Sequence, residues 1–178
     1  MRALFALAGV ALHCGYEPLY ATPAAERFRV ELVKSQVSSV VVAQAVVRGA
    51  RDALADEGAL APGSGYPRLE IEVLRADETS EAIVQAETPQ GGVPRARATD
   101  LTVVARAWVV RRPGAPAELD TGDLRADALM GSPLGNAGAE LWQREDSLRA
   151  IARRLGARIA ARILGHPTVI TPPSTDPP

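Results

Sequence analysis

Residues 97–112 read RATDLTVVARAWVVRR and show the clearest alternation of side chains in the chain. A period of two residues is typical of a β-strand that buries one face and exposes the other. The predicted buried face is built from small and branched apolar side chains, and the opposite face includes an arginine and a tryptophan. One face carries Leu101, Val103, Ala105, Ala107 and Val109, and the other carries Thr102, Val104, Arg106, Trp108 and Val110.

Three further segments are predicted to be strands that accompany this one. Residues 27–34 and 68–76 alternate in the same way. The alternation weakens at residues 77–81 and then resumes, so one long strand with a bulge and two strands with a turn both stay open. The proline- and glycine-containing turn at residues 113–116 is followed by a fourth strand, expected from about residue 117 to 129.

Two amphipathic helices complete the pattern. The first is expected to begin at a cap, Ser38 or Ser39, and to end near Gly58, because serine caps helix starts and glycine tolerates the conformation past helix ends. The second covers about residues 140–164 and ends at Gly165. The arginines outside its apolar stripe are interpreted as a solvated helix face: Arg149, Arg153, Arg154, Arg158 and Arg162.

The order of these elements, β-α-β-β-β-α, predicts an α+β two-layer sandwich. Two helices would pack on one face of a roughly four-stranded mixed sheet, and the small Ala105 and Ala107 would let them approach it closely. For Trp108 two interpretations stay open, a ring lying over the sheet edge and an interface anchor. The other sheet face, polar enough to stand in water, is expected to present Arg29, Glu31, Glu70, Glu72, Arg106, Trp108, Arg125 and Asp127.

Cys14 is the only cysteine, and it follows a short apolar leader typical of secretory signal peptides. The leader is too short to cross a bilayer, which takes about 20 apolar residues. A cysteine at this place indicates a bacterial lipoprotein, anchored by acyl chains on Cys14. A buried thiol at Cys14 and an ordinary cleaved signal peptide stay open as alternatives. His13 also departs from the small residue expected before a lipidated cysteine.

The 178 residues are about one domain's worth. We predict a signal peptide at residues 1–13, a lipidated tether at 14–26, one α+β domain at 27–165 and a disordered proline-rich tail at 166–178. The net charge of −1 gives no global field toward nucleic acid, so no nucleic-acid partner is expected.

The chain lacks the residues of common catalytic sites. After removal of residues 1–13, His166 is the only histidine, which excludes histidine-dependent triads and a histidine zinc cluster. Glu70 and Glu72 share a strand face, as a carboxylate pair for sugar hydrolysis could, but alternating glutamates on a solvated face are far commoner. We therefore expect no enzyme activity, no cofactor and no metal.

The run Cys14-Gly15-Tyr16, followed by Pro18-Leu19-Tyr20, and the order of the elements together resemble the LPS-assembly lipoproteins of the LptE family. The resemblance covers nearly all of residues 14–165. It implies an outer-membrane lipoprotein, anchored at the periplasmic face, that assists lipopolysaccharide transport and assembly. Such proteins act as plug and assembly partner of the LptD β-barrel and contact lipopolysaccharide. A periplasmic lipid-transfer accessory lipoprotein without a barrel partner is the alternative.

The resemblance also implies ligand contacts from basic residues on the sheet and its loops. Arginine binds phosphate through paired hydrogen bonds. Lys34 is the only lysine among the 20 basic residues, a bias that genomic base composition also explains. The ligand-binding candidates, chosen around the third strand and its ends, are Arg95, Arg97, Arg106, Arg111 and Arg112. The candidates for a partner interface are Tyr16, Tyr20 and Trp108.

Overall fold

The structure is a computed structural model that describes residues 26–83, 96–133 and 137–166. The predicted signal peptide, Cys14 and all of the tether except Glu26 lie outside the described residues. The proline-rich tail beyond His166 also lies outside them.

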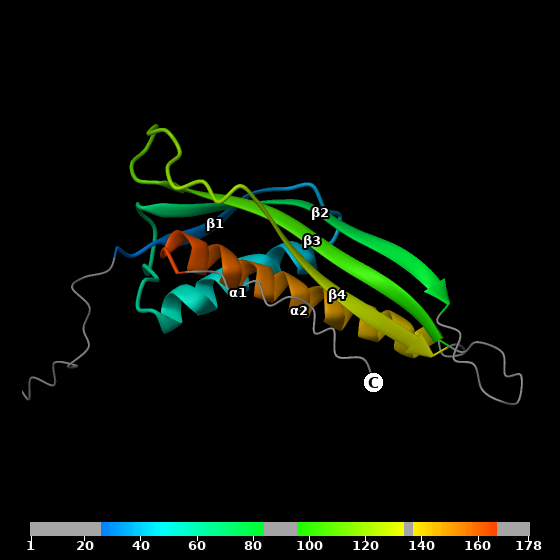
Figure 1. The fold of residues 1–178 in the computed structure, drawn as a ribbon. Coiled ribbons are helices and arrows are strands. Elements are labelled where there is room, and N and C mark those ends of the chain that lie inside the picture. Colours follow the sequence, from blue (N-terminus) through cyan, green and yellow to red (C-terminus); the bar gives the residue numbers. More distant parts are fainter. Residues whose placement is uncertain (1–25, 84–95, 134–136, 167–178) are drawn as a thin grey trace, which may run out of the picture.

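Two helices pack on one face of a four-stranded sheet, as the sequence predicted (Figure 1). The strands lie in the order β1-β2-β3-β4, with β1 parallel to β2 and the other neighbours antiparallel. The sheet is therefore mixed and the fold is α+β. The elements are β1 (Arg29–Ser35), α1 (Val40–Asp56), β2 (Arg68–Ile83), β3 (Ala96–Val110), β4 (Asp123–Pro133) and α2 (Ala137–Ile163).

β3 confirms the alternation seen in residues 97–112. Its apolar face lies under the helices, and the five residues predicted there have no exposed surface. Ala105 and Ala107 leave room for helix side chains such as Ile151, Leu155 and Ile159, which are also fully buried. Burying such side chains stabilises the fold by about 1.5–3 kcal/mol each.

β2 settles the choice that its sequence left open. It is one strand of 16 residues, and its pairing with β3 shifts register between Val73 and Arg75. The extra residue, Leu74, forms a bulge, and a second register shift lies between Glu81 and Ile83.

The predicted start of the fourth strand at residue 117 is wrong, because β4 begins at Asp123. Leu119 (φ 48°) and Gly122 (φ 64°) both adopt a left-handed backbone conformation, which interrupts an extended strand. The carboxylate of Asp120 accepts a hydrogen bond from the Gly122 amide at 2.9 Å and holds this turn. Before β4 begins, Glu118 pairs with Val109 of β3, and the Thr121 amide donates a hydrogen bond to the Ala107 carbonyl at 2.8 Å.

The predicted end of the fourth strand near residue 129 and the predicted start of the second helix near residue 140 are also wrong. β4 continues to Pro133, and α2 begins at Ala137, earlier than expected. The β4 extension pairs Pro133 with Ala96 of β3, a contact distant in sequence that local turn residues do not reveal.

The limits of α1 match the predicted signals. Ser39 is the N-cap, and its hydroxyl accepts a hydrogen bond from the Val42 amide at 3.4 Å. Gly58 follows the helix with φ 67°, the left-handed conformation that glycine adopts without a steric cost. Neither α1 nor α2 combines the length and apolar composition needed to cross a membrane.

Candidate functional site

The open face of the sheet is polar, as predicted, and its side chains form cross-strand contacts. Glu70 lies opposite Trp108 in the β2–β3 register, and Glu72 lies opposite Arg106. The indole Nε1 of Trp108 donates a hydrogen bond to Glu70 Oε2 at 2.9 Å. Since β3 is an internal strand, the half-buried Trp108 does not lie over the sheet edge. Its role as an interface anchor stays a prediction.

Arg106 is engaged by a carboxylate from the turn before β4. Its guanidinium forms a two-nitrogen ion pair with Asp120, with Nε 2.9 Å from Oδ1. The hydrogen bonds from Arg106, and then that from the Gly122 amide, lower the pKa of Asp120 to about 2. The same contact raises the pKa of Arg106. A phosphate group would have to displace Asp120 in order to bind Arg106.

Arg111, just beyond the end of β3, and Arg125 of β4 are also paired. Arg111 forms ion pairs with Glu118 and Glu26. Arg125 Nε lies 2.5 Å from Asp127 Oδ1, and these contacts raise the pKa of Arg125. Carboxylates therefore compensate the positive charges of Arg106, Arg111 and Arg125.

The four described members of the five arginines predicted to contact ligand do not form one site. Arg97 lies in β3 opposite Ser132, whereas Arg111 and Arg112 follow the other end of this strand. At about 3.4 Å per residue, the 15 residues of β3 separate the two ends by roughly 50 Å. Arg95 lies outside the described residues, as do the interface candidates Tyr16 and Tyr20.

A hollow of about 430 Å³ lies on the open face beside the β2 bulge. Its walls mix charges of both signs, because Arg75 and Arg125 line it together with Asp123. Arg75 is itself paired with Asp77 at 3.2 Å. The hollow therefore has no clear preference for an anion. The lining residues are Gln36, Leu74, Arg75, Val104, Asp123 and Arg125.

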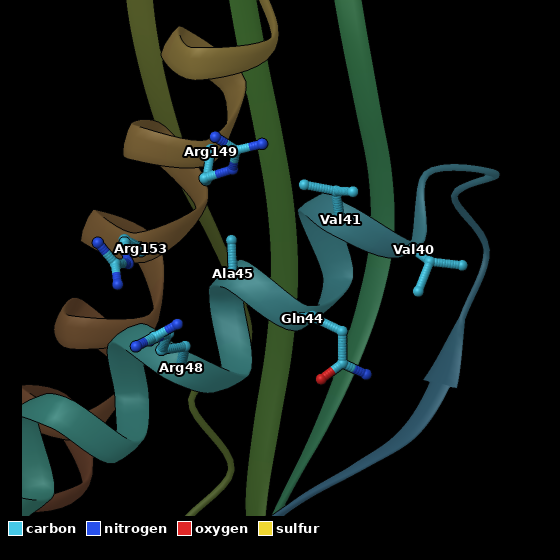
Figure 2. Close-up of a pocket in the computed structure, with 7 residues that line it drawn as sticks. All are labelled: Val40, Val41, Gln44, Ala45, Arg48, Arg149 and Arg153. Atoms are coloured by element: carbon cyan, nitrogen blue, oxygen red, sulfur yellow. The ribbon is translucent and has the colours of Figure 1, made fainter.

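A second hollow, of about 360 Å³, lies on the helix side of the molecule, where the first half of α1 crosses α2 (Figure 2). We call it the helix groove. It combines apolar side chains with three arginines, and no carboxylate of the described residues lines it. Its residues are Val40, Val41, Gln44, Ala45, Arg48, Arg149 and Arg153.

Sequence reasoning missed the helix groove. It placed Arg149 and Arg153 on a solvated helix face and gave Arg48 no role. The i, i+4 spacing of Arg149 and Arg153 indicated that they share one face of α2. The contribution of Arg48 depends on the packing of two helices that are distant in sequence, which no local pattern reveals.

The two glutamates weighed as a catalytic pair accept hydrogen bonds from neighbouring side chains. Glu70 is bound by Trp108, and Glu72 is bound by Lys34 at 2.8 Å and Gln36 at 3.1 Å. These contacts lower the pKa of Glu72. Neither glutamate lines either of the two hollows. Within the described ranges, no three His, Cys, Asp or Glu side chains are grouped to hold a metal ion.

No protein-family profile and no curated protein matches the chain. Among solved structures, a minor lipoprotein from Acinetobacter baumannii is 11% identical, covers 79% of this chain and 93% of its own, and has a TM-score of 0.48. The rare lipoprotein B from Shewanella oneidensis is 14% identical over 77% of this chain and 91% of its own, with a TM-score of 0.38.

A lipoprotein B from Nitrosomonas europaea is 12% identical over 76% of this chain and 83% of its own, with a TM-score of 0.43. Lipoproteins, the class that the sequence resemblance named, are thus among the chains that this fold is similar to.

Proposed function

We propose that the chain is an outer-membrane lipoprotein that assists lipopolysaccharide transport and assembly, as plug and assembly partner of an LptD-type β-barrel. The observation that carries the proposal is the element order β1-α1-β2-β3-β4-α2, on which the resemblance to the LptE family rests together with the Cys14-Gly15-Tyr16 run. The Cys14-Gly15-Tyr16 start behind an apolar leader supplies the anchor in this proposal.

The open face of the sheet supports the plug role. Charged side chains on this face pair with one another, as in the Arg106–Asp120 and Arg125–Asp127 pairs, so these pairs add polarity without adding net charge. The lumen of a large β-barrel is polar as well. A face of this kind suits such a lumen, because neither surface must bury an unpaired charge on contact.

Depletion of the protein in its own cells tests this proposal. Barrel assembly is followed by the electrophoretic mobility of the folded LptD-type barrel, and surface lipopolysaccharide by antibody labelling of intact cells. We expect misassembled barrel and reduced surface lipopolysaccharide. Normal levels of both after depletion would contradict the proposal.

The alternative, a lipid-transfer accessory without a barrel partner, calls for a lipid-sized cavity between the helices and the sheet. Of the two hollows described, one lies on the open sheet face and the other on the helix crossing. The space between the layers is filled by fully buried side chains such as Leu54, Ile71 and Leu155. We therefore favour the barrel partner.

A further inference from the structure

We propose that the helix groove binds the phosphate headgroup of a lipid, with Arg48 and Arg153 on the phosphate and the valines of α1 against the acyl chain. This inference deepens the proposed function, and it rests on that function only for the supply of lipid to the groove. It also places the anion contacts on the helix layer, away from the sheet arginines that the family resemblance suggested.

The charges of the groove support an anion. No carboxylate lines it, and no ion pair is recorded for Arg48 or Arg153 among the described residues. Arg149 is paired with Glu145 at 3.0 Å and Asp146 at 2.8 Å, so it contributes less net charge. Two guanidinium groups remain to form paired, charge-assisted hydrogen bonds with phosphate oxygens.

Apolar side chains at the mouth of the groove favour a lipid over a free phosphate ion. Val40 is 71% exposed and Val41 is 41% exposed, although both are large and apolar. With Ala45 they form an apolar wall. The volume of about 360 Å³ lies at the lower end of the roughly 300–1,000 Å³ typical of small-ligand sites, enough for a headgroup and the first part of a chain.

The competing occupant is an acidic peptide segment. Arginine clusters can bind acidic motifs, but a glutamate-rich segment offers nothing apolar to the exposed Val40 and Val41. Figure 2 shows Arg149 and Arg153 from α2 and Arg48 from α1 on the same side of the crossing as Ala45. Arginines from both helices and the exposed valines of α1 line the same groove, which matches a lipid that carries charged and apolar parts in one molecule.

The glycine contact beneath the groove holds the two arginines together. A Cβ placed on Gly49 would lie 2.1 Å from the carbonyl oxygen of Arg153, so the backbones of α1 and α2 meet at this point. Arg48 precedes Gly49 in α1 and is therefore brought next to Arg153. The close helix crossing thus determines the spacing of the anion contacts.

Calorimetric titration of the purified full-length chain tests the site. The probes are a monomeric short-chain phosphatidic acid, the matching phosphatidylcholine and inorganic phosphate. We expect phosphatidic acid to bind most tightly. The double variant Arg48→Gln/Arg153→Gln should lose at least about tenfold in affinity, since two charge-assisted contacts are removed. Arg154→Gln is the matched control, because Arg154 is exposed on α2 but does not line the groove.

A second variant keeps the arginines and changes the apolar wall. Val41→Ser should weaken phosphatidic acid binding and leave the response to inorganic phosphate unchanged. Circular dichroism checks that each variant is folded; if the double variant does not fold, Val41→Ser decides the proposal by the same comparison of probes. Three results would each overturn the proposal. The folded double variant could bind phosphatidic acid as tightly as the parent chain does. Inorganic phosphate, or a glutamate-rich peptide, could bind the parent chain as tightly as phosphatidic acid does.

The two proposals fail in different experiments. The titration uses purified protein and reports on the groove alone. If depletion leaves barrel assembly normal while the titration behaves as expected, the proposed function falls and the lipid site stands. If depletion disturbs assembly while the double variant still binds lipid fully, the lipid site falls and the proposed function stands.

Discussion

Gly49 of α1 and Gly156 of α2 face each other where the two helices cross, and neither position has room for a side chain. A Cβ on Gly156 would lie 2.0 Å from the carbonyl oxygen of Val46 and 3.0 Å from the carbonyl carbon of Gly49. The atoms in contact are backbone atoms, which cannot move aside as a flexible side chain can. The helix layer therefore depends on this pair of glycines.

We predict that Gly156→Ala destabilises the protein. Alanine favours a helix over glycine by about 1 kcal/mol, but overpacking a close contact typically costs about 1–3 kcal/mol, and here two backbones must separate. We expect a net loss of roughly 1–2 kcal/mol in the free energy of unfolding, measured by urea denaturation. Gly65→Ala is the control, since a Cβ there meets nothing within 4 Å. Unchanged stability of Gly156→Ala would contradict the close crossing.

We predict that the Arg106–Asp120 pair makes stability depend on pH in the acid range. The pKa of Asp120 is lowered from 3.8 to about 2 in the folded protein. The stability that the ionised Asp120 adds to the folded protein is therefore present above pH 3.8 and is lost as the pH falls from there toward 2. Both side chains are more than a third exposed, so solvent screening keeps the effect small.

The measurement for this pair is the urea midpoint between pH 5 and pH 2, compared between the parent chain and Asp120→Asn. The variant should be less stable at pH 5, and the difference should shrink as the pH is lowered. Asp52→Asn on the exposed side of α1 controls for the loss of a surface carboxylate. A difference that stays constant across this range would show that the ion pair does not persist in solution.

We predict that Leu155→Ala costs about 2–5 kcal/mol of unfolding free energy, because Leu155 is fully buried between α2 and the sheet and its truncation leaves a cavity. Leu141→Ala on the same helix should have little effect, since Leu141 is 63% exposed. Thermal or urea denaturation of both variants checks the pair. Similar losses of unfolding free energy at the two sites would show that Leu155 does not lie on the face of α2 that packs against the sheet.

Much of the fold follows from local patterns in the sequence. The alternation around Ala105 placed β3 and its buried face, and Ser39 and Gly58 marked the limits of α1, because these signals depend on neighbouring residues alone. The start of β4 was missed because Asp120 and Gly122 form a turn within a segment that otherwise alternates.

The candidate site followed less well from the sequence. Arg106 and Arg111 were chosen as anion contacts from their position on the third strand, but their carboxylate partners come from other segments of the chain. The helix groove was missed for a related reason. Arg48 and Arg153 meet through the Gly49 contact between two distant helices, and periodicity within one helix says nothing about its partner.

The most direct test of the central claim, a lipidated plug for an LptD-type barrel, is mass spectrometry of the protein purified from detergent-solubilised outer membranes. We predict that an LptD-type barrel copurifies with the chain. We also predict that the chain's N-terminal peptide begins at Cys14 with attached acyl groups. A chain recovered without a barrel, or an N-terminus with an unmodified Cys14, would contradict the account.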